Sequence, residues 1–364
     1  MFNNIYKNKK VLITGHTGFK GTWLTAWLLK LGANIIGVSK DIPTNPAMFD
    51  ELNMETQIQH NLVDIRNFKE THTIINCEKP DFIFHLAAQA IVSTSYSDPL
   101  ETISSNVIGT ANILESLRQS NHPCTAIIIT SDKAYDNVEQ IWGYKENDSM
   151  GGKDIYSGSK GAAELIIKSF YNSYFKLDQS NVRLCVARAG NVIGGGDWAK
   201  DRIIVDAMSA WSKGESVEIR SPNATRPWQH VLEPLSGYLS LGEQLFLDKN
   251  LTGEGFNFGP AAEQNRTVYE LLIESSKYWK VNYEKAIVVT DNIPFHEAGL
   301  LKLNCDKALS ILKWKATLEY SDTVRFTNEW YLGYQKGDSM FKETLNQIDE
   351  YEALATNKNL QWTE

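Results

Sequence analysis

Cysteine is scarce in this sequence, and its spacing suits neither a disulfide framework nor a metal site. Only four cysteines occur in 364 residues, and they are far apart along the chain. Each is typical of a small buried hydrophobic residue in a reducing compartment, so the sequence predicts no bound metal. The four are Cys77, Cys124, Cys185 and Cys305.

Long apolar runs and an excess of basic residues are also missing. The first ten residues are polar and basic, and no apolar segment behind them could serve as a secretion signal. The most apolar early segment, residues 22–31, is too short to span a bilayer and contains Lys30. The net charge of −8 argues against nucleic acid as a partner, because binding it requires a basic face. We therefore expect a cytoplasmic protein with neither a nucleic-acid nor a membrane partner.

The composition is that of an ordinary globular protein, 42% hydrophobic and 22% charged. Through the first 190 residues, short apolar segments alternate with stretches of helical periodicity. This alternation predicts a doubly wound α/β (Rossmann) fold, a parallel sheet covered by helices on both faces. The predicted strands are 11–14, 35–38, 82–85, 126–129 and 184–187, and the predicted helices lie near 22–31, 67–77, 99–119 and 157–175.

The pattern changes near Gly190, where a glycine-rich loop and short mixed elements rich in Trp, Arg and Pro begin. We expect a Rossmann domain over residues 1–190 and a smaller substrate-binding domain over 191–340. Segments from about 226–260 are expected to return to the first domain. The polar stretch 341–364 is expected to be a fraying tail. A chain of this length is long for one compact unit, which agrees with two fused domains.

A glycine-rich turn directly follows the first predicted strand. Gly15, Gly18 and Gly21 recur at every third position, so backbone amides can approach a pyrophosphate at the positive end of the next helix. Its place after the first strand favours dinucleotide binding over a turn without a ligand. The other loop residues expected to contact the cofactor are Thr17, Phe19 and Lys20.

Weaker signals extend the cofactor site. Asp41 lies near the end of the second strand, where an acid can accept hydrogen bonds from the adenosine ribose. A solvated loop aspartate is an equally good interpretation. Ser39 and Lys40 beside it leave a 2′-phosphate open on charge alone. Further cofactor contacts are predicted for Asp64 and Ile65 at the adenine edge and for Leu86, Ala87 and Ala88 along the cofactor backbone.

Tyr156 and Lys160 stand four residues apart in a predicted helix, so both side chains project from one face. A lysine ammonium beside a phenol favours the phenolate, so we expect the pKa of Tyr156 to be lowered toward the range of a general base. Alone, a Tyr-x-x-x-Lys spacing arises often by chance as a surface pair. Behind a dinucleotide loop in an alternating α/β chain, it becomes much more specific.

With these motifs the chain resembles the extended short-chain dehydrogenase/reductase family. The resemblance implies NAD as the cofactor, with Asn106 among the residues that contact it. It also implies a homodimer, or a homotetramer, through the helices near 100–118 and 156–175. The matching motifs are the glycine loop, Leu86-Ala87-Ala88-Gln89, Asn106-Val107-x-Gly109-Thr110, Tyr156-x-x-x-Lys160 and Arg188-x-Gly190-Asn191-Val192-x-Gly194.

Two ionisable residues after the predicted strand 126–129 set this chain apart within the family. Reductases and epimerases need a hydroxyl there, equivalent to Ser131, and have no use for Asp132 and Lys133 beside it. An exposed ion pair of little consequence is the alternative interpretation. Placement in the expected active site favours chemistry beyond hydride transfer. The resemblance thus narrows to the sugar-nucleotide 4,6-dehydratase branch, many of whose members carry glutamate where this chain has Lys133.

That branch removes water from carbons 5 and 6 of a nucleotide-linked glucose. Tyr156 is expected to take the proton of the C4 hydroxyl while the C4 hydride passes to NAD. The resulting ketone acidifies the C5 hydrogen, which Lys133 could remove if nearby cations depress its pKa. Asp132 could assist departure of the C6 hydroxyl if burial raises its pKa. Return of the hydride to C6 regenerates the cofactor.

Long blocks over 190–202 and 226–234 imply that the glucose is carried on CDP, for deoxysugar biosynthesis of the O-antigen (lipopolysaccharide) type. Arg202 and Arg226 are natural partners of the substrate pyrophosphate, because a guanidinium can hold two phosphate oxygens. Trp198 could stack on the substrate, although core packing is more usual for tryptophan. The preference for cytidine comes from the resemblance alone. The remaining residues expected to contact substrate are Gln89, Asn191, His230 and His296.

Three alternatives stay open at this level. The substrate could be another nucleotide sugar. The protein could instead be a sugar-nucleotide epimerase or reductase, which would give Asp132 and Lys133 no role. A non-catalytic NAD(H)-sensing module is the third alternative, and the presence of Ser131, Tyr156 and Lys160 argues against it.

Overall fold

The structure, a computed structural model, describes residues 1–120, 122–177, 179–290 and 299–364 and is built on a seven-stranded sheet. The strand order is β11-β6-β5-β4-β1-β2-β3, and every neighbouring pair is parallel. This confirms the predicted doubly wound fold. The strands are β1 Lys10–Thr14, β2 Asn34–Ser39, β3 Gln59–Leu62, β4 Phe82–His85, β5 Cys124–Ile129, β6 Val182–Ala189 and β11 Gly255–Phe258.

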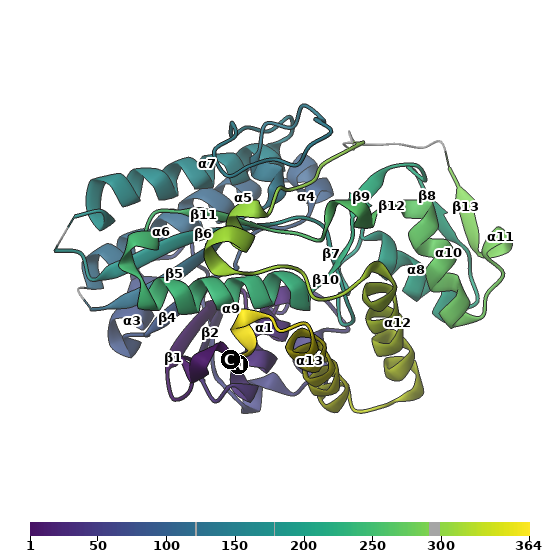
Figure 1. Cartoon of the computed structure of the whole chain (residues 1–364), viewed down its shortest axis with the longest axis horizontal. Coiled ribbons are helices and arrows are strands. Elements are labelled where there is room, and N and C mark those ends of the chain that lie inside the picture. Colours follow the sequence, from purple (N-terminus) through teal and green to yellow (C-terminus); the bar gives the residue numbers. More distant parts are fainter. Residues whose placement is uncertain (121, 178, 291–298) are drawn as a thin grey trace.

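Helices cover both faces of this sheet (Figure 1). Along β1, Val11 and Ile13 belong to one buried core and Leu12 to another, as alternation along a strand requires. The core around Val11 includes side chains of α1, α9 and α13, and the core around Leu12 includes side chains of α3, α6 and α7. The helices are α1 Phe19–Lys30, α2 Met48–Glu51, α3 Phe68–Glu78, α4 Val92–Ser97, α5 Pro99–Ile103, α6 Gly109–Ser120, α7 Ile155–Phe170, α8 Ile203–Ser212, α9 Leu232–Leu247, α10 Val268–Trp279, α11 Tyr283–Ala286, α12 Tyr320–Lys336 and α13 Met340–Asn357.

The strand order reverses direction between β1 and β4, since β2 and β3 lie on one side of β1 and β4, β5 and β6 on the other. In doubly wound sheets, ligands bind outside the carboxyl ends of the strands at such a switch point. The glycine loop after β1 and the segments after β4 and β5 all leave the sheet at this edge. The fold therefore brings the predicted cofactor and catalytic motifs to one place.

Three small two-stranded sheets lie beyond the main sheet, toward the right of Figure 1. They combine with α8, α10 and α11 around the second half of the chain. The intervening β11 leaves this region and joins the main sheet next to β6. The division of the chain into two domains stays a prediction. The small sheets pair β7 Val192–Ile193 with β10 Gln229–His230, β9 Thr225–Pro227 with β12 Asn265–Thr267, and β8 Val217–Ile219 with β13 Ile287–Val289.

The C-terminal stretch is an ordered helix, so the prediction of a fraying tail is wrong. Helix α13 packs against α1, and the Trp27 indole donates a hydrogen bond of 2.7 Å to Glu352. The apolar residues Ile348, Tyr351 and Ala355 are fully buried and follow one another at spacings of three and four. A mostly polar sequence hides this narrow helical stripe when only average polarity is considered.

A buried carboxylate joins α9 to the C-terminal region. Glu233 accepts hydrogen bonds from the backbone N–H groups of Thr317 (2.9 Å) and Leu318 (2.5 Å) and from the Tyr351 hydroxyl (2.8 Å). Burial raises the pKa of Glu233 to about 7, although the hydrogen bonds that it accepts lower this pKa. One side chain thus fixes the positions of α9, the 317–318 segment and α13 relative to one another.

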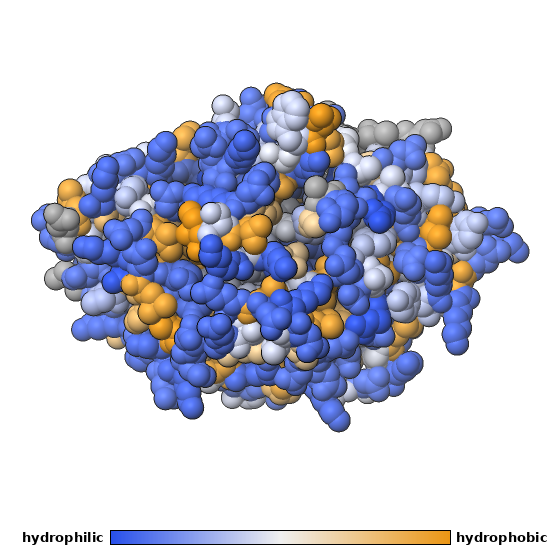
Figure 2. All heavy atoms as spheres, viewed as in Figure 1, coloured by the Kyte–Doolittle hydropathy of each residue, from blue (hydrophilic) through white to orange (hydrophobic). Residues whose placement is uncertain are grey.

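None of the described helices combines the length and apolarity needed to cross a membrane. On the face seen in Figure 2, hydrophilic residues cover most of the surface, and apolar residues lie in small scattered groups. This surface is what the charged fraction of the sequence predicts.

A close backbone contact at Gly195 yields a stability prediction. A Cβ atom at Gly195 would lie 2.0 Å from Cγ of the buried Trp330, whereas one at Gly158 in α7 would have nothing within 4 Å. We expect Gly195→Ala to lower the free energy of unfolding by roughly 1–3 kcal/mol through overpacking. The matched Gly158→Ala should raise it by about 0.5–1 kcal/mol, because alanine favours helix. Urea denaturation measures both, and a Gly195→Ala variant as stable as the parent would contradict the packing argument.

Candidate active site

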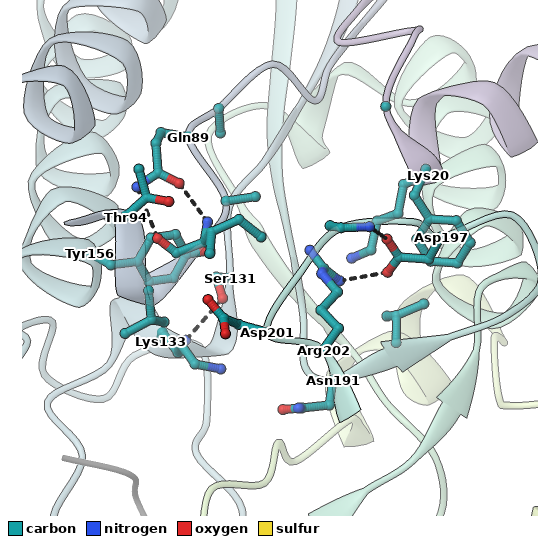
Figure 3. Close-up of a pocket in the computed structure, with 18 of the residues that line it drawn as sticks. Lys20, Gln89, Thr94, Ser131, Lys133, Tyr156, Asn191, Asp197, Asp201 and Arg202 are labelled. Carbon is teal, nitrogen blue, oxygen red and sulfur yellow. Dashed lines mark hydrogen bonds and ion pairs between the residues drawn. The ribbon is translucent and has the colours of Figure 1, made fainter. Parts of the chain in front are cut away.

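A cavity of about 1150 Å³ opens at the carboxyl edge of the sheet. Small-molecule sites commonly occupy about 300–1,000 Å³, so this cavity has room for more than one ligand. The glycine loop and residues 39–48 line one end, and residues 189–206 and 218–221 line the other. Residues 129–133 and the start of α7 lie between them. Figure 3 shows side chains from both halves of the chain converging on this space.

The glycine loop fits a dinucleotide. Gly15 has a positive φ of 75°, and a Cβ there would lie 2.8 Å from the backbone nitrogen of Ala87. At Gly21 a Cβ would lie 2.0 Å from the Gly15 carbonyl oxygen. Internal packing therefore requires both of these glycines. At Gly18 a Cβ would meet the protein only at an ordinary 3.4 Å, so that glycine keeps space open in front of the α1 N-terminus, where a phosphate group would bind.

Charges at the adenosine end favour a ribose hydroxyl over a 2′-phosphate. Asp41 lines the cavity, and its backbone carbonyl accepts a hydrogen bond of 2.7 Å from Thr17 Oγ1. Lys40 next to it is paired with Glu101 at 2.8 Å, which neutralises the cation that could have held a phosphate. Asp64 also lines the cavity, and hydrogen bonds from the Arg66 guanidinium hold its pKa below the usual range.

The predicted cofactor contacts Ile65, Leu86, Ala87 and Ala88 all line the cavity. The side-chain amide of Asn106 supports the segment 86–89 from behind. Asn106 is buried; its Oδ1 accepts from the backbone N–H of Gln89 (2.8 Å), and its Nδ2 donates to Ser159 Oγ (2.8 Å). The prediction that Asn106 contacts the cofactor is therefore wrong, because its amide is used within the protein. Gln89 lines the cavity, but its own side-chain amide bonds Ile91 and Thr102.

The five predicted catalytic residues all line the cavity. Ser131 follows β5, and its hydroxyl donates a hydrogen bond of 2.9 Å to Asp132 Oδ1 and is hydrogen-bonded with Tyr156. Lys133 Nζ lies 3.8 Å from the same Asp132 oxygen. Lys160 Nζ lies 5.9 Å from the centre of the Tyr156 ring. Two elements, the β5–α7 connection and α7 itself, thus supply one cluster.

Burial changes the acid–base properties of the tyrosine–lysine pair. It raises the pKa of Tyr156 to about 12, with a further contribution from the Asp132 carboxylate, against the opposing effects of Arg202 and Ser131. Burial also lowers the pKa of Lys160 to about 8, against the effect of Glu164. The expectation that Lys160 lowers the pKa of Tyr156 is wrong for the protein alone, because loss of water outweighs the nearby ammonium.

Asp132 has one oxygen available to a ligand. The residue is 1% exposed, and Oδ2 has no hydrogen-bond partner in the described part of the chain. A Cβ atom at Gly190 would lie only 3.1 Å from Oδ2, so the glycine leaves space beside it. A buried polar atom without a partner is costly and requires an explanation. A hydroxyl of a bound ligand in the cavity would supply the missing hydrogen bond.

Several cations line the cavity, and three of them, Lys133, Lys160 and Arg202, lie near enough to Lys20 to act on its charge. Arg202 forms an ion pair of 3.1 Å with Asp197. Lys20 reaches in from the first turn of α1 toward Arg202 (Figure 3), and in the described part of the chain it forms no ion pair. Burial lowers the pKa of Lys20 to about 7, and Arg202 adds to this effect. This arrangement suits a ligand with more than one negative charge.

The other predicted substrate residues divide into three groups. Asn191, Arg226 and Trp198 line the cavity, although the Trp198 ring also packs against Tyr331 with ring centres 5.3 Å apart. His230 is fully buried between aromatic rings and does not reach the cavity, so its predicted substrate contact is wrong. His296 lies outside the described residues.

Sequence reasoning missed several cavity residues. Asp206 on α8 lines the far end, and burial followed by the nearby Asp201 raises its pKa to about 6. Asp197 orients Arg202. The glycine-rich sequence before Asp197 predicts a loop, but nothing in its spacing tells which side chains face the cavity. The missed residues that line the cavity include Thr94, Asp197, Asp201 and Asp206.

The chain matches proteins of known activity. The model of the GDP-mannose 4,6 dehydratase family matches residues 12–327. The chain is 41% identical over 356 residues to CDP-glucose 4,6-dehydratase of Salmonella typhimurium, an alignment that covers 97% of this chain and 99% of that protein.

Solved structures share the fold. DesIV, a dTDP-glucose 4,6-dehydratase from Streptomyces venezuelae with NAD and TYD bound, has a TM-score of 0.77 at 17% identity, covering 91% of this chain and 99% of that one. UDP-glucose 4-epimerase from Thermotoga maritima with UDP-glucose also has a TM-score of 0.77, at 20% identity, covering 89% and 99%. Dehydratases and epimerases therefore have similar folds, and only the site can separate them.

The unpaired Lys20 yields a prediction on stability. Lys20→Met should raise Tm by about 3 °C at pH 6 and by less at pH 9. Below pH 7 the folded protein carries the cost of a desolvated ammonium. That cost falls as pH rises through 7, because the folded protein releases a proton that the unfolded chain still holds.

Lys30, in the same helix, is the matched control. Burial opposes its charge, but hydrogen bonds to Glu352 and Asp349 outweigh burial and raise its pKa. Lys30 is charged in both the folded and the unfolded protein at pH 6 and at pH 9. Lys30→Met should therefore lower Tm, and the decrease at pH 6 should be similar to the decrease at pH 9. Differential scanning calorimetry measures both variants. A Lys20→Met variant with lower Tm at pH 6 would contradict the account of an uncompensated cation.

Proposed function

This chain belongs to the GDP-mannose 4,6-dehydratase family, and from that premise we propose that it is a lyase that dehydrates CDP-glucose. The product is CDP-4-dehydro-6-deoxyglucose, and the cofactor is NAD. The observation that carries the proposal is the placement of Asp132 and Lys133 beside Ser131, Tyr156 and Lys160 on one cavity wall. The 41% identity to the Salmonella CDP-glucose 4,6-dehydratase supports the choice of substrate.

The oxidation half-reaction belongs to Tyr156. Its hydroxyl, hydrogen-bonded with Ser131, takes the proton of the substrate C4 hydroxyl. When bound, NAD supplies the acceptor and later the donor of the hydride, and its oxidised form brings a positive charge. Because burial raises the pKa of Tyr156, the phenolate depends on cations in the cavity, and Lys160 is the one on its own helix face.

The elimination half-reaction belongs to Asp132 and Lys133. Once C4 is a ketone, the C5 hydrogen is acidic enough for a neutral amine, and Lys133 removes it as a proton. Asp132 gives a proton from Oδ2 to the C6 hydroxyl, which leaves as water. When the hydride returns to C6, Lys133 gives a proton back to C5, and the proton that Tyr156 took from the C4 hydroxyl restores the acid. The free position of Oδ2 in a dry part of the wall suits a group that exchanges a proton with substrate.

Cationic side chains in the cavity bind the nucleotide part of the substrate. Arg202 and Arg226 are the proposed partners of the substrate pyrophosphate, and Lys20, which the sequence predicts at the cofactor, lies near enough to Arg202 to add its charge. A guanidinium already aligned by Asp197 can hold phosphate oxygens with parallel hydrogen bonds. Asn191 lines the cavity beside them and donates from its amide.

A homodimer is part of the same proposal, with a tetramer as the alternative. Apolar side chains stand exposed on the helices predicted to form the interface, among them Leu100 (76% exposed) and Leu165 (58%). Exposed apolar groups of this kind are typical of surfaces that a second copy covers. A cytoplasmic location and a role in deoxysugar synthesis for lipopolysaccharide complete the proposal. Further exposed apolar residues there are Ile103, Ile108, Ile155 and Tyr174.

Incubation with CDP-glucose and NAD tests the activity. We expect a 4-keto-6-deoxy sugar, detected by its absorbance in alkali, and faster turnover than with UDP-glucose, dTDP-glucose or GDP-mannose at matched concentration. A 4-epimer as product would replace the dehydratase with an epimerase. Faster turnover of another nucleotide sugar would keep the reaction and change the substrate.

Lys133→Ala should separate the two half-reactions. We expect elimination to fall by about 10²–10⁴-fold, as for loss of a general base, while C4 oxidation falls much less. NADH should then accumulate in a single turnover, and C5 should exchange little deuterium with solvent. Tyr156→Phe is the contrasting variant and should lose both steps. Equal loss of both steps in Lys133→Ala would remove Lys133 from the role of C5 base.

A further inference from the structure

The segment that carries Asp132 and Lys133 is held at both ends by buried side chains. At its start, Thr130 Oγ1 donates a hydrogen bond of 2.5 Å to Glu164 Oε1. Just past its end, the Tyr135 hydroxyl accepts one of 2.6 Å from Arg188 Nη1. The residues between these two points form a single helical turn, Asp132–Ala134. Both ends are thus fastened to a second layer of side chains.

That second layer is one ion pair. Arg188 Nε donates to Glu164 Oε1 (2.7 Å) and Nη2 donates to Glu164 Oε2 (3.0 Å), an arrangement with two parallel hydrogen bonds. Both side chains are 6% exposed. Arg188 Nη1 also donates to the Glu146 carbonyl (3.1 Å). The pair therefore binds Thr130 through its anion and Tyr135 through its cation.

The same ion pair belongs to the catalytic helix. Glu164 lies four residues after Lys160 and eight after Tyr156 in α7, so all three project from one helix face. Arg188 extends from β6, next to β5 in the sheet. The oxidation residues on α7 and the elimination residues after β5 are therefore joined through Glu164 and Arg188.

Stability alone explains this arrangement poorly. A buried ion pair costs several kcal/mol of desolvation, and well-packed apolar residues of similar volume often stabilise a protein equally well or better. In the described part of the chain, neither Glu164 nor Arg188 lines the cavity, so neither contacts a ligand. What the pair supplies is fixed geometry, and misplacement of a reacting group by 1 Å can cost about 10²-fold in rate.

We propose that the Glu164–Arg188 pair is a positioning device that sets the place of Asp132 and Lys133 relative to Tyr156 and thereby couples elimination to oxidation. The proposal rests on the proposed function. It concerns positioning residues, because the pair acts through Thr130 and Tyr135 on groups that touch substrate. Ser131 directly follows Thr130, whose backbone N–H donates a hydrogen bond of 2.9 Å to Ala187 of β6, so the Tyr135 end controls Asp132 and Lys133 more than it controls Ser131.

Tyr135→Phe is the decisive variant. The ring should keep its place, since it stacks on Tyr144 at 5.2 Å and lies 5.0 Å from the Arg188 guanidinium. Tyr135 also lines the cavity, and the variant keeps its ring there while the hydroxyl bonds to Arg188 and to Asn257 Oδ1 (2.9 Å) are lost. We expect elimination from CDP-glucose to slow by about 10–100-fold while C4 oxidation changes less than about 3-fold. NADH should then build up in a single turnover, and we expect no such build-up with the wild-type protein.

Tyr351→Phe is the matched control. It removes an equally buried phenol hydroxyl, 2.8 Å from a carboxylate oxygen of Glu233, far from the cavity. It should lower the free energy of unfolding to a similar extent as Tyr135→Phe and leave the ratio of oxidation to elimination unchanged. A structural role alone would make the two variants alike in both measurements.

Arg188→Lys completes the test. Lysine keeps the charge but cannot hold Glu164 and Tyr135 together with fixed geometry. In a double-mutant cycle, the elimination rate of the double variant should fall by less than the product of the two single decreases. Arg188→Lys and Tyr135→Phe remove the same contact, so their effects are not additive. Tyr135→Phe with oxidation and elimination reduced equally would overturn the positioning role and leave the proposed function standing. Wild-type protein that forms no 4-keto-6-deoxy product would overturn both.

Discussion

The burial of charge is the constraint on which this structure depends. Lys20, Lys160, Asp132 and the Glu164–Arg188 pair all lie wholly or partly out of water around one cavity. Each of these groups costs free energy to desolvate, and the cost is offset only by partners and by the two apolar cores on either face of the sheet. The two large apolar cores are therefore what permits a site with so many buried charges, and the cations among them are what a polyanionic substrate requires.

Local patterns were sufficient to predict most of the sheet. β1, β2, β4, β5 and β6 are short apolar runs, and a run of that kind is buried wherever the chain folds. The C-terminal helix α13 escaped prediction because its stripe of Ile348, Tyr351 and Ala355 gains meaning only when α1 and α9 are there to cover it. The pairing of β11 with β6 likewise depends on a contact between distant segments, which no local period encodes.

The site, like the fold, was predictable where local motifs define it and not where distant segments meet. Motifs with fixed spacing, the glycine loop and Tyr156/Lys160, predicted which residues would meet at the cavity. They did not predict the direction of the Tyr156 pKa, since a pKa is set by everything that surrounds the group and not by its nearest partner in sequence. His230 and Asn106 failed for a related reason: membership of a motif does not say whether a side chain faces the ligand or the core. The second layer of Glu164, Arg188 and Tyr135 has no spacing signal, because three separate elements contribute it.

The docking of α13 on α1 has a consequence for synthesis. The ribosome makes β1 and α1 before α9 and β11, and α13 follows all of these elements. Until α13 emerges, the side of α1 that it covers is open to water, and the Trp27 indole lacks its bond to Glu352. Glu352 lies 325 residues after Trp27, so α1, which begins at the glycine loop, waits through most of the synthesis of the fold for its final packing.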